Sequence, residues 1–138
     1  HLFIARSALK LEKRDVAQQA YKKVEELARG ERKAEALYYK AMFKNEAGNH
    51  KESNQIVQEI TKNYSNYRKF SLQSLVLMAD NFYRLDDAYQ ANYILENVVE
   101  KTDDFPEVQQ KAQELLQEIK SEAAKTNSSV ESEEENGE

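Results

Sequence analysis

Histidine and aspartate are the residues of this chain that could do chemistry, and their spacing argues against a reaction centre. The sequence has two histidines, His1 and His50, and no cysteine. His50 follows the turn-forming pair Gly48 and Asn49, and no acid, serine or cysteine stands at a spacing that would make it a general base. We therefore interpret His50 as a solvated turn residue, with a role as a ligand or base as the alternative.

Three aspartates could suggest a cation site. Asp80, Asp86 and Asp87 lack the glycine and the bidentate glutamate that a calcium loop needs. Turn and helix-capping roles explain the pair at 86 and 87. No glycine-rich phosphate loop occurs either. The sequence therefore predicts no enzyme activity, no metal site and no cofactor.

Composition favours helices and excludes two classes of partner. Three glycines and one proline in 138 residues are too few for a β-rich fold. The segment 126–138 carries five of the 25 acids and no base, which leaves 20 acids against 20 bases in the rest. That balance predicts no nucleic-acid binding. No apolar run approaches the roughly 18–20 residues that span a bilayer, so direct membrane insertion is not expected.

Apolar residues at helical spacing predict seven helices. They cover residues 1–11, 15–28, 31–47, 51–63, 69–85, 88–101 and 108–124. Gly30 is expected to end the second helix in the left-handed conformation, and Gly48 to form a tight turn. Past Lys125 the apolar pattern stops, so residues 125–138 are predicted to be an acidic disordered tail. Docking to a basic partner is the alternative role for that tail.

Internal repetition is the strongest signal in the sequence. Five residues of the middle of the chain, Ala41, Gly48, Ser53, Val57 and Ile60, have counterparts 38 residues later at Ala79, Asp86, Ala91, Leu95 and Val98. Four of them have counterparts 36 residues earlier, at Ala5, Ala17, Tyr21 and Val24. Small residues thus stand at both predicted helix crossings three times over.

At these positions the chain resembles the tetratricopeptide repeat (TPR) family, a helix–turn–helix motif of about 34 residues. Ala41, Gly48 and Ser53 match its small and turn sites, and Phe82 takes an aromatic site. Lys40 departs from the pattern at a site that is usually apolar. The resemblance covers about residues 1–105, and especially suggests the C-terminal repeats of long bacterial, Bacteroidetes-like TPR proteins. It implies a bacterial cell envelope or periplasmic location.

The resemblance implies an all-α fold, a right-handed α-solenoid of TPR-like helix hairpins. Its units would be a truncated first unit at residues 1–30, a second at 34–67 and a third at 72–105. Residues 106–124 would form a C-terminal capping helix, because a solenoid must cover its exposed apolar end.

A concave groove lined by the first helix of each unit follows from the same resemblance. The matching positions are Leu2, Arg6, Leu9, Glu35, Tyr38, Met42, Asn45, Gln73, Val76, Asp80, Tyr83 and Arg84. The predicted partner-binding residues among them are Arg6, Tyr38, Met42, Asn45, Asp80, Tyr83 and Arg84, since aromatic residues and arginine most often anchor interfaces. Alternatively, the two tyrosines and the methionine pack between units. The Lys, Asn and Arg clamp with which some members bind C-terminal carboxylates is missing.

The predicted function is a non-enzymatic protein–protein interaction scaffold that presents this groove to a protein or peptide partner. The alternative is a purely structural C-terminal cap, or a self-association module, of a longer repeat array. That alternative rests on His1, which falls inside the first helix of its unit, so that the chain is expected to begin in mid-repeat.

Overall fold

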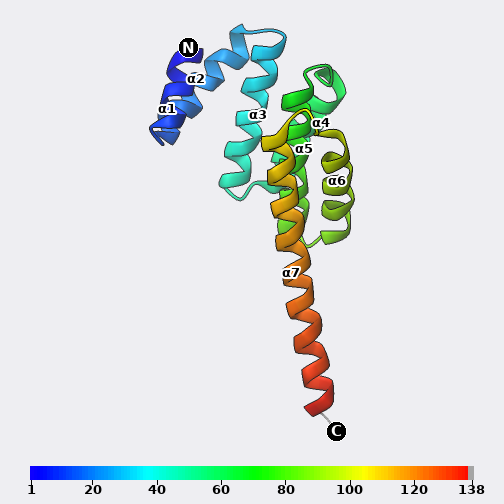
Figure 1. Ribbon diagram of the computed structural model, residues 1–138. Coiled ribbons are helices and arrows are strands. Elements are labelled where there is room, and N and C mark those ends of the chain that lie inside the picture. Colours follow the sequence, from blue (N-terminus) through cyan, green and yellow to red (C-terminus); the bar gives the residue numbers. More distant parts are fainter. Residues whose placement is uncertain (137–138) are drawn as a thin grey trace.

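The computed structural model describes residues 1–136, with side chains up to residue 127, and this part of the chain is all-helical (Figure 1). It has seven helices and no strand: α1 (Leu2–Lys10), α2 (Arg14–Leu27), α3 (Glu31–Glu46), α4 (His50–Asn63), α5 (Arg68–Arg84), α6 (Ala88–Lys101) and α7 (Pro106–Asn136). The predicted all-α class is confirmed. The bounds of α1 to α6 agree with the predicted ranges to within one residue at each end.

The last helix, α7, differs from the prediction. It continues to Asn136 and leaves the helical body (Figure 1), whereas the sequence predicted a helix that ends near residue 124 and a disordered tail beyond it. The apolar stripe does stop there, but a helix ends at a stop signal, and no glycine or proline lies between Pro106 and Gly137. Gly137 and Glu138, the end of the predicted tail, lie outside the described residues.

The three turns inside the hairpins share one geometry. Glu12, Gly48 and Asp86, which the internal repeat places at equivalent positions, all have positive φ, at 57°, 83° and 62°. The backbone N–H of the next residue donates a hydrogen bond to the carbonyl oxygen five residues before it. The N···O distance is 2.8 Å in all three cases: Lys13 to Ala8, Asn49 to Lys44 and Asp87 to Phe82. This is the Schellman arrangement, which satisfies carbonyls at a helix end. The repeat is therefore a repeat of backbone geometry as well as of residue type.

Of two further turn residues, Gly30 was predicted only in part and Asp87 was predicted correctly. Gly30 has positive φ, but it precedes α3 as its N-cap residue and does not follow the end of α2 directly. Its φ of 67° and ψ of −138° lie in a region that is essentially open to glycine alone. The capping role predicted for the aspartate pair is confirmed at Asp87, whose carboxylate accepts from the Gln90 N–H at 3.1 Å.

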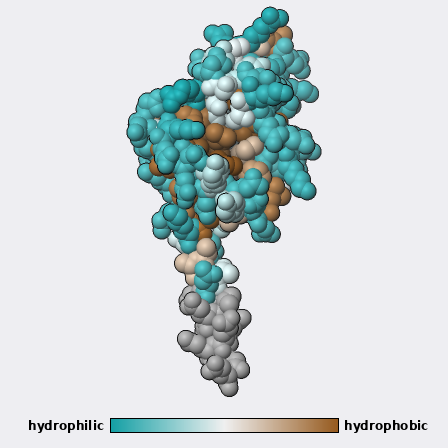
Figure 2. Space-filling model, turned by 90° about the vertical axis from the view of Figure 1, so that its right-hand side faces the viewer, coloured by the Kyte–Doolittle hydropathy of each residue, from teal (hydrophilic) through white to brown (hydrophobic). Residues whose placement is uncertain are grey.

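Small residues occupy the helix crossings of each hairpin. All six of them are fully buried: Ala5 and Ala17, Ala41 and Ser53, Ala79 and Ala91. Their size lets the paired helices approach closely, and the Ser53 hydroxyl is satisfied by the Ala41 carbonyl at 2.8 Å. Outside the core, hydrophilic residues cover most of the face shown in Figure 2, with apolar residues in a central band.

Helix packing follows chain order and adds contacts between alternate helices. Each helix packs on the next, and α3 also packs on α5, as α5 does on α7. The backbones of α1 and α3 make no such contact, and the α1–α2 hairpin lies to one side of the others (Figure 1). Among residues 1–136, no helix combines the length and hydropathy that crossing a bilayer requires.

Candidate functional site

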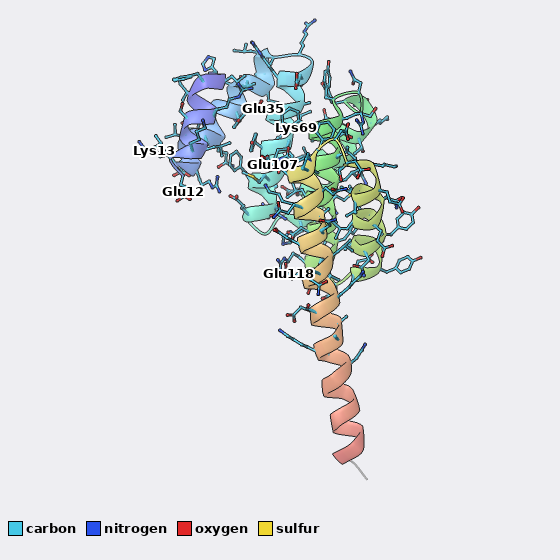
Figure 3. The ribbon with its side chains drawn as sticks, viewed as in Figure 1. Glu12, Lys13, Glu35, Lys69, Glu107 and Glu118 are labelled. Atoms are coloured by element: carbon cyan, nitrogen blue, oxygen red, sulfur yellow. The ribbon has the colours of Figure 1, made fainter. Side chains whose placement is uncertain are left out.

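An open cleft of about 1460 Å³ lies between the facing sides of α1, α3, α5 and α7. Its floor is aromatic and aliphatic, with contributions from Tyr38, Phe70, Val76, Leu77 and Leu115. Figure 3 shows Glu35, Lys69 and Glu107 around its upper end, and Glu118 farther down α7. Small-molecule pockets usually measure about 300–1,000 Å³. The size of this cleft therefore suits a polypeptide segment better than a metabolite.

Four of the seven predicted groove residues line this cleft: Arg6, Tyr38, Asn45 and Asp80. The other three lie elsewhere. Met42 packs against the core of the α1–α2 hairpin, and Tyr83 packs into the core formed by α5, α6 and α7. Arg84 lies at the edge, where it pairs with Asp80 at 3.5 Å and Glu118 at 3.9 Å. The structure thus brings together in one cleft a predicted position of α1, two of α3 and one of α5.

The α7 side of the cleft was missed by sequence reasoning. Glu107, Lys111, Glu114 and Glu118 all line the cleft, as does Leu115. Their spacing of four, three and four residues marks one face of a helix, so the signal was present in the sequence. Sequence reasoning treated α7 as a cap with a solvated outer face, and the groove positions were taken from the first helix of each unit alone.

A buried carboxylate joins the first hairpin to the rest of the molecule. Glu35 on α3 is 6 % exposed and accepts from Arg6 Nε at 3.1 Å and from Arg6 Nη2 at 2.7 Å. The Tyr21 hydroxyl donates to the same carboxylate at 2.8 Å. Burial raises the pKa of Glu35, but the hydrogen bonds from Arg6 and Tyr21 outweigh it and hold that pKa below its ordinary value of 4.5. Glu35 is therefore ionised and fully engaged at neutral pH.

A row of aromatic rings continues from this carboxylate across the cleft floor. Tyr21 stacks on Tyr39 with centroids 4.6 Å apart, Tyr39 meets the edge of Tyr38 at 5.0 Å, and Tyr38 lies 6.4 Å from Phe70. Burial raises the pKa of Tyr38 to about 12, and burial with the Glu35 hydrogen bond raises the pKa of Tyr21. These hydroxyls stay protonated at neutral pH. The tyrosine rings can pack against a partner and their hydroxyls can form hydrogen bonds, but a protonated hydroxyl does not act as a general base.

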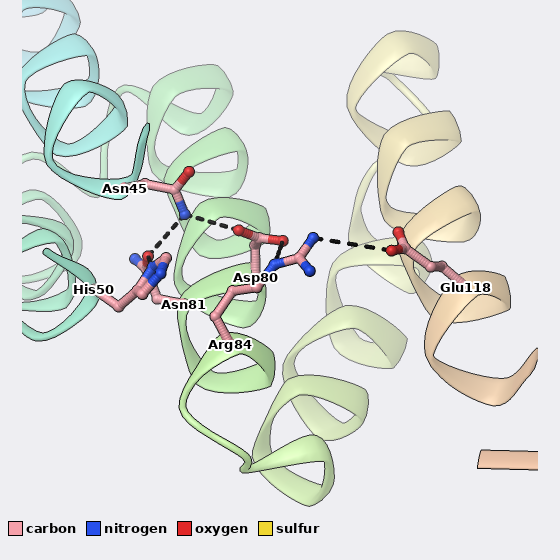
Figure 4. Close-up of polar contacts among 6 residues, drawn as sticks. All are labelled: Asn45, His50, Asp80, Asn81, Arg84 and Glu118. Carbon is pink, nitrogen blue, oxygen red and sulfur yellow. Dashed lines mark hydrogen bonds and ion pairs between the residues drawn. The ribbon is translucent and has the colours of Figure 1, made fainter. Parts of the chain in front are cut away.

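A second polar network centres on Asn81, which is fully buried on α5. Its Nδ2 donates to Ser53 Oγ at 2.7 Å and to Asn54 Oδ1 at 2.9 Å. Its Oδ1 accepts from Asn45 Nδ2 at 2.8 Å, and Asn45 also donates to Asp80 at 2.8 Å (Figure 4). Through Asp80 and Arg84 the network extends to Glu118 on α7 (Figure 4). Its hydrogen bonds therefore tie α3, α4 and α5 together at one end of the cleft, and only the long, exposed ion pair reaches α7.

His50 belongs to this network, which corrects its prediction as a solvated turn residue. The side chain is partly buried at the start of α4, and its Nδ1 lies 2.8 Å from Asn81 Oδ1 (Figure 4). Since Ser53 donates to Ala41, it accepts from the Asn81 amide, which fixes Oδ1 of Asn81 as an acceptor. His50 must therefore donate from Nδ1–H. That nitrogen is then unable to act as a base or to bind a metal.

The comparisons with known proteins add no assignment to this geometry. No family model, curated protein or solved structure matches the chain. The likeness to TPR proteins consequently remains a prediction, and the cleft has to be understood from the residues that line it.

Among the described residues, two arginines at the cleft are already paired. Arg6 is committed to Glu35, and Arg84 to Asp80. Residues 1–127 contain no group of three or more histidine, aspartate or glutamate side chains that could hold a metal ion. What the arrangement offers is a long apolar floor between charged rims, which is the composition of a surface that binds another polypeptide.

Proposed function

We propose that this chain is a non-enzymatic protein–protein interaction scaffold, a right-handed α-solenoid of TPR-like hairpins whose cleft binds a segment of a partner protein. The observation that carries the proposal is the cleft itself, which the first helices of three successive hairpins border together with α7. Stacked helix pairs generate extended concave surfaces of this kind.

Two further features support the proposal. The hairpins repeat the same positive-φ turn and the same small residues at their crossings, as expected of a repeat architecture. The cleft floor is rich in aromatic side chains that already pack against one another, and such side chains anchor partners at a low cost in conformational entropy.

The test takes advantage of the lack of cysteine. Peptides that bind the chain are selected from a random display library, and binding is measured on two single-cysteine variants labelled with a bulky maleimide. Lys111→Cys places the adduct in the cleft, and Lys120→Cys places it on the same helix but outside the cleft; both lysines are exposed. We expect the adduct at 111 to block binding and the adduct at 120 to leave it intact. A library that yields no binder, or binders indifferent to the adduct at 111, would refute the proposal.

A second candidate function is self-association or capping of a repeat array, and one surface favours it. The first two helices expose several large apolar side chains: Phe3 is 82 % exposed, Leu27 69 % and Leu11 66 %, and Ile4 and Val16 are exposed as well. If this surface pairs two copies, light scattering should show a dimer that Phe3→Ser with Leu11→Ser converts to a monomer. A wild-type chain that stays monomeric at high concentration removes this candidate.

A further inference from the structure

The two sides of the cleft differ in charge. On the α7 side, Glu107, Glu114 and Glu118 face the cleft with one base, Lys111, among them. On the opposite side, α1 and α3 contribute Arg6, Lys10 and Arg32 against Glu31 and Glu35. The α7 side is therefore acidic by two charges within that set and the opposite side is slightly basic, while Lys69 and Asp80 of α5 cancel each other. A segment in the cleft experiences this asymmetry across its width.

The carboxylates of α7 are available to a partner. Glu107, Glu114 and Glu118 are all exposed. Within the described part of the chain, Glu114 accepts a hydrogen bond from neutral Gln110 at 3.2 Å, and Glu118 has Arg84 at the long distance of 3.9 Å. Glu35, by contrast, is buried and saturated by Arg6 and Tyr21. The acidic side is thus a row of solvated charges beside an apolar floor.

We propose that the cleft binds an apolar segment that carries lysine or arginine along one edge, with that edge against α7. This inference rests on the proposed function and names the chemistry of the partner. Glu107, Glu114 and Glu118 follow one another at seven and four residues, or about 10 Å and 6 Å along the helix. A partner helix beside α7 repeats the same spacing, so bases one and two turns apart on one face meet successive carboxylates.

In this complex, apolar contacts determine the affinity, and the charges determine the selectivity and the rate of association. Exposed ion pairs contribute little each, so affinity comes from apolar side chains on the floor around Phe70, Val76 and Leu115. The carboxylates select against acidic segments and speed the encounter with basic ones. Binding should therefore weaken as salt is added, since salt screens solvated pairs.

The experiment uses two synthetic amphipathic peptides with identical leucines, one with lysine and one with glutamate at its polar positions. Fluorescence anisotropy at low salt measures the binding of each to the full chain. We expect the lysine peptide to bind about tenfold or more tightly than the glutamate peptide. In E114K/E118K this preference should disappear or invert. The control E96K/E100K makes the same change in net charge on exposed residues of α6, four positions apart, and should retain the preference.

Each outcome decides the inference. If the lysine peptide fails to bind, if both peptides bind equally, or if the preference survives E114K/E118K, the inference is wrong. It is also wrong if the α6 control loses the preference as fully, because net charge would then explain the result. None of these outcomes decides the proposed function. That function is tested by the random-library binders, which the adduct at position 111 should block whatever their charge.

Discussion

Asn81 allows the sharpest test of how the described network holds the helices together. It is fully buried and makes four hydrogen bonds, to Ser53, Asn54, Asn45 and His50. Asn81→Leu keeps the branched shape and the number of side-chain heavy atoms and is somewhat bulkier, so none of the expected effect comes from a cavity. The main cost is therefore that of leaving polar partners without a bond, to which the extra volume of leucine adds.

The magnitude follows from what each partner loses. Asn54 is 7 % exposed, and its Oδ1 becomes a buried unsatisfied acceptor, at a cost of about 1–3 kcal/mol. Ser53 still donates to the Ala41 carbonyl, and the partly exposed Asn45 and His50 can turn to water. Together these smaller losses add about 1 kcal/mol. We expect the free energy of unfolding to fall by about 2–4 kcal/mol.

Urea unfolding, monitored by far-ultraviolet circular dichroism, measures the free energy of unfolding of each variant. The values can be compared directly only if the m-value is the same in wild type and variant. Gln113→Leu, on the exposed face of α7, is the control and should change stability by less than about 0.5 kcal/mol. Asn54→Leu combined with Asn81→Leu removes both ends of one bond, so the double variant should be less destabilised than the sum of the single variants. A loss below about 1 kcal/mol for Asn81→Leu, or strict additivity, would refute this account of the network.

Three further predictions concern turns and ionisation. Glu12→Gly should raise the free energy of unfolding by up to about 1 kcal/mol in the same urea assay, because glycine adopts positive φ without strain. Gly48→Ala at the equivalent turn should lower it by a similar amount. If both variants changed stability in the same direction, the shared turn geometry would be contradicted. The ionised form of Glu35 stabilises the fold, so this stability is complete above its ordinary pKa of 4.5 and is lost as pH falls through its lowered folded pKa. Unfolding midpoints between about pH 3 and pH 6 should therefore show a shallower acid decline in Glu35→Gln than in wild type, and an unchanged slope would contradict the Arg6 and Tyr21 contacts. Ultraviolet titration should show a tyrosine ionisation step well above pH 10, since burial raises the Tyr38 pKa to about 12. The amplitude of that step should be smaller in Tyr38→Phe. If the step were the same in the variant and the wild type, it would belong to other tyrosines.

The helices of the body could be predicted because their signals are local. Apolar residues recur at helical spacing, and turn residues stand between the runs, so α1 to α6 were located to within one residue. The small residues at the crossings were found from their spacing alone. The positive φ at Glu12 was not foreseen, because glutamate carries no local preference for that conformation and is held there by the hairpin around it.

The candidate site was predicted less completely, because it depends on which distant segments meet. Tyr38 and Asp80 were placed in the groove by matching positions, but the same matching included Met42 and Tyr83, which pack into cores. Asn81 stands in a helix rich in leucine and aromatic residues, and its partners come from two other helices about 30 residues away. No pattern within one helix reveals such a partner set.

The missing backbone contact between α1 and α3 has a thermodynamic consequence. Residues of α3 and α5 have neighbouring helices on both sides, whereas the first hairpin is attached through α2 and α3 and through the bridge from Arg6 to Glu35. Opening of residues 1–28 should therefore cost less free energy than global unfolding. Amide hydrogen exchange in α1 should accordingly be faster than in α3 and α5. Arg6 and Lys10 border the cleft from this hairpin, so a segment bound there slows that exchange by mass action. Occupancy of the cleft and order in the first hairpin are in this way linked equilibria.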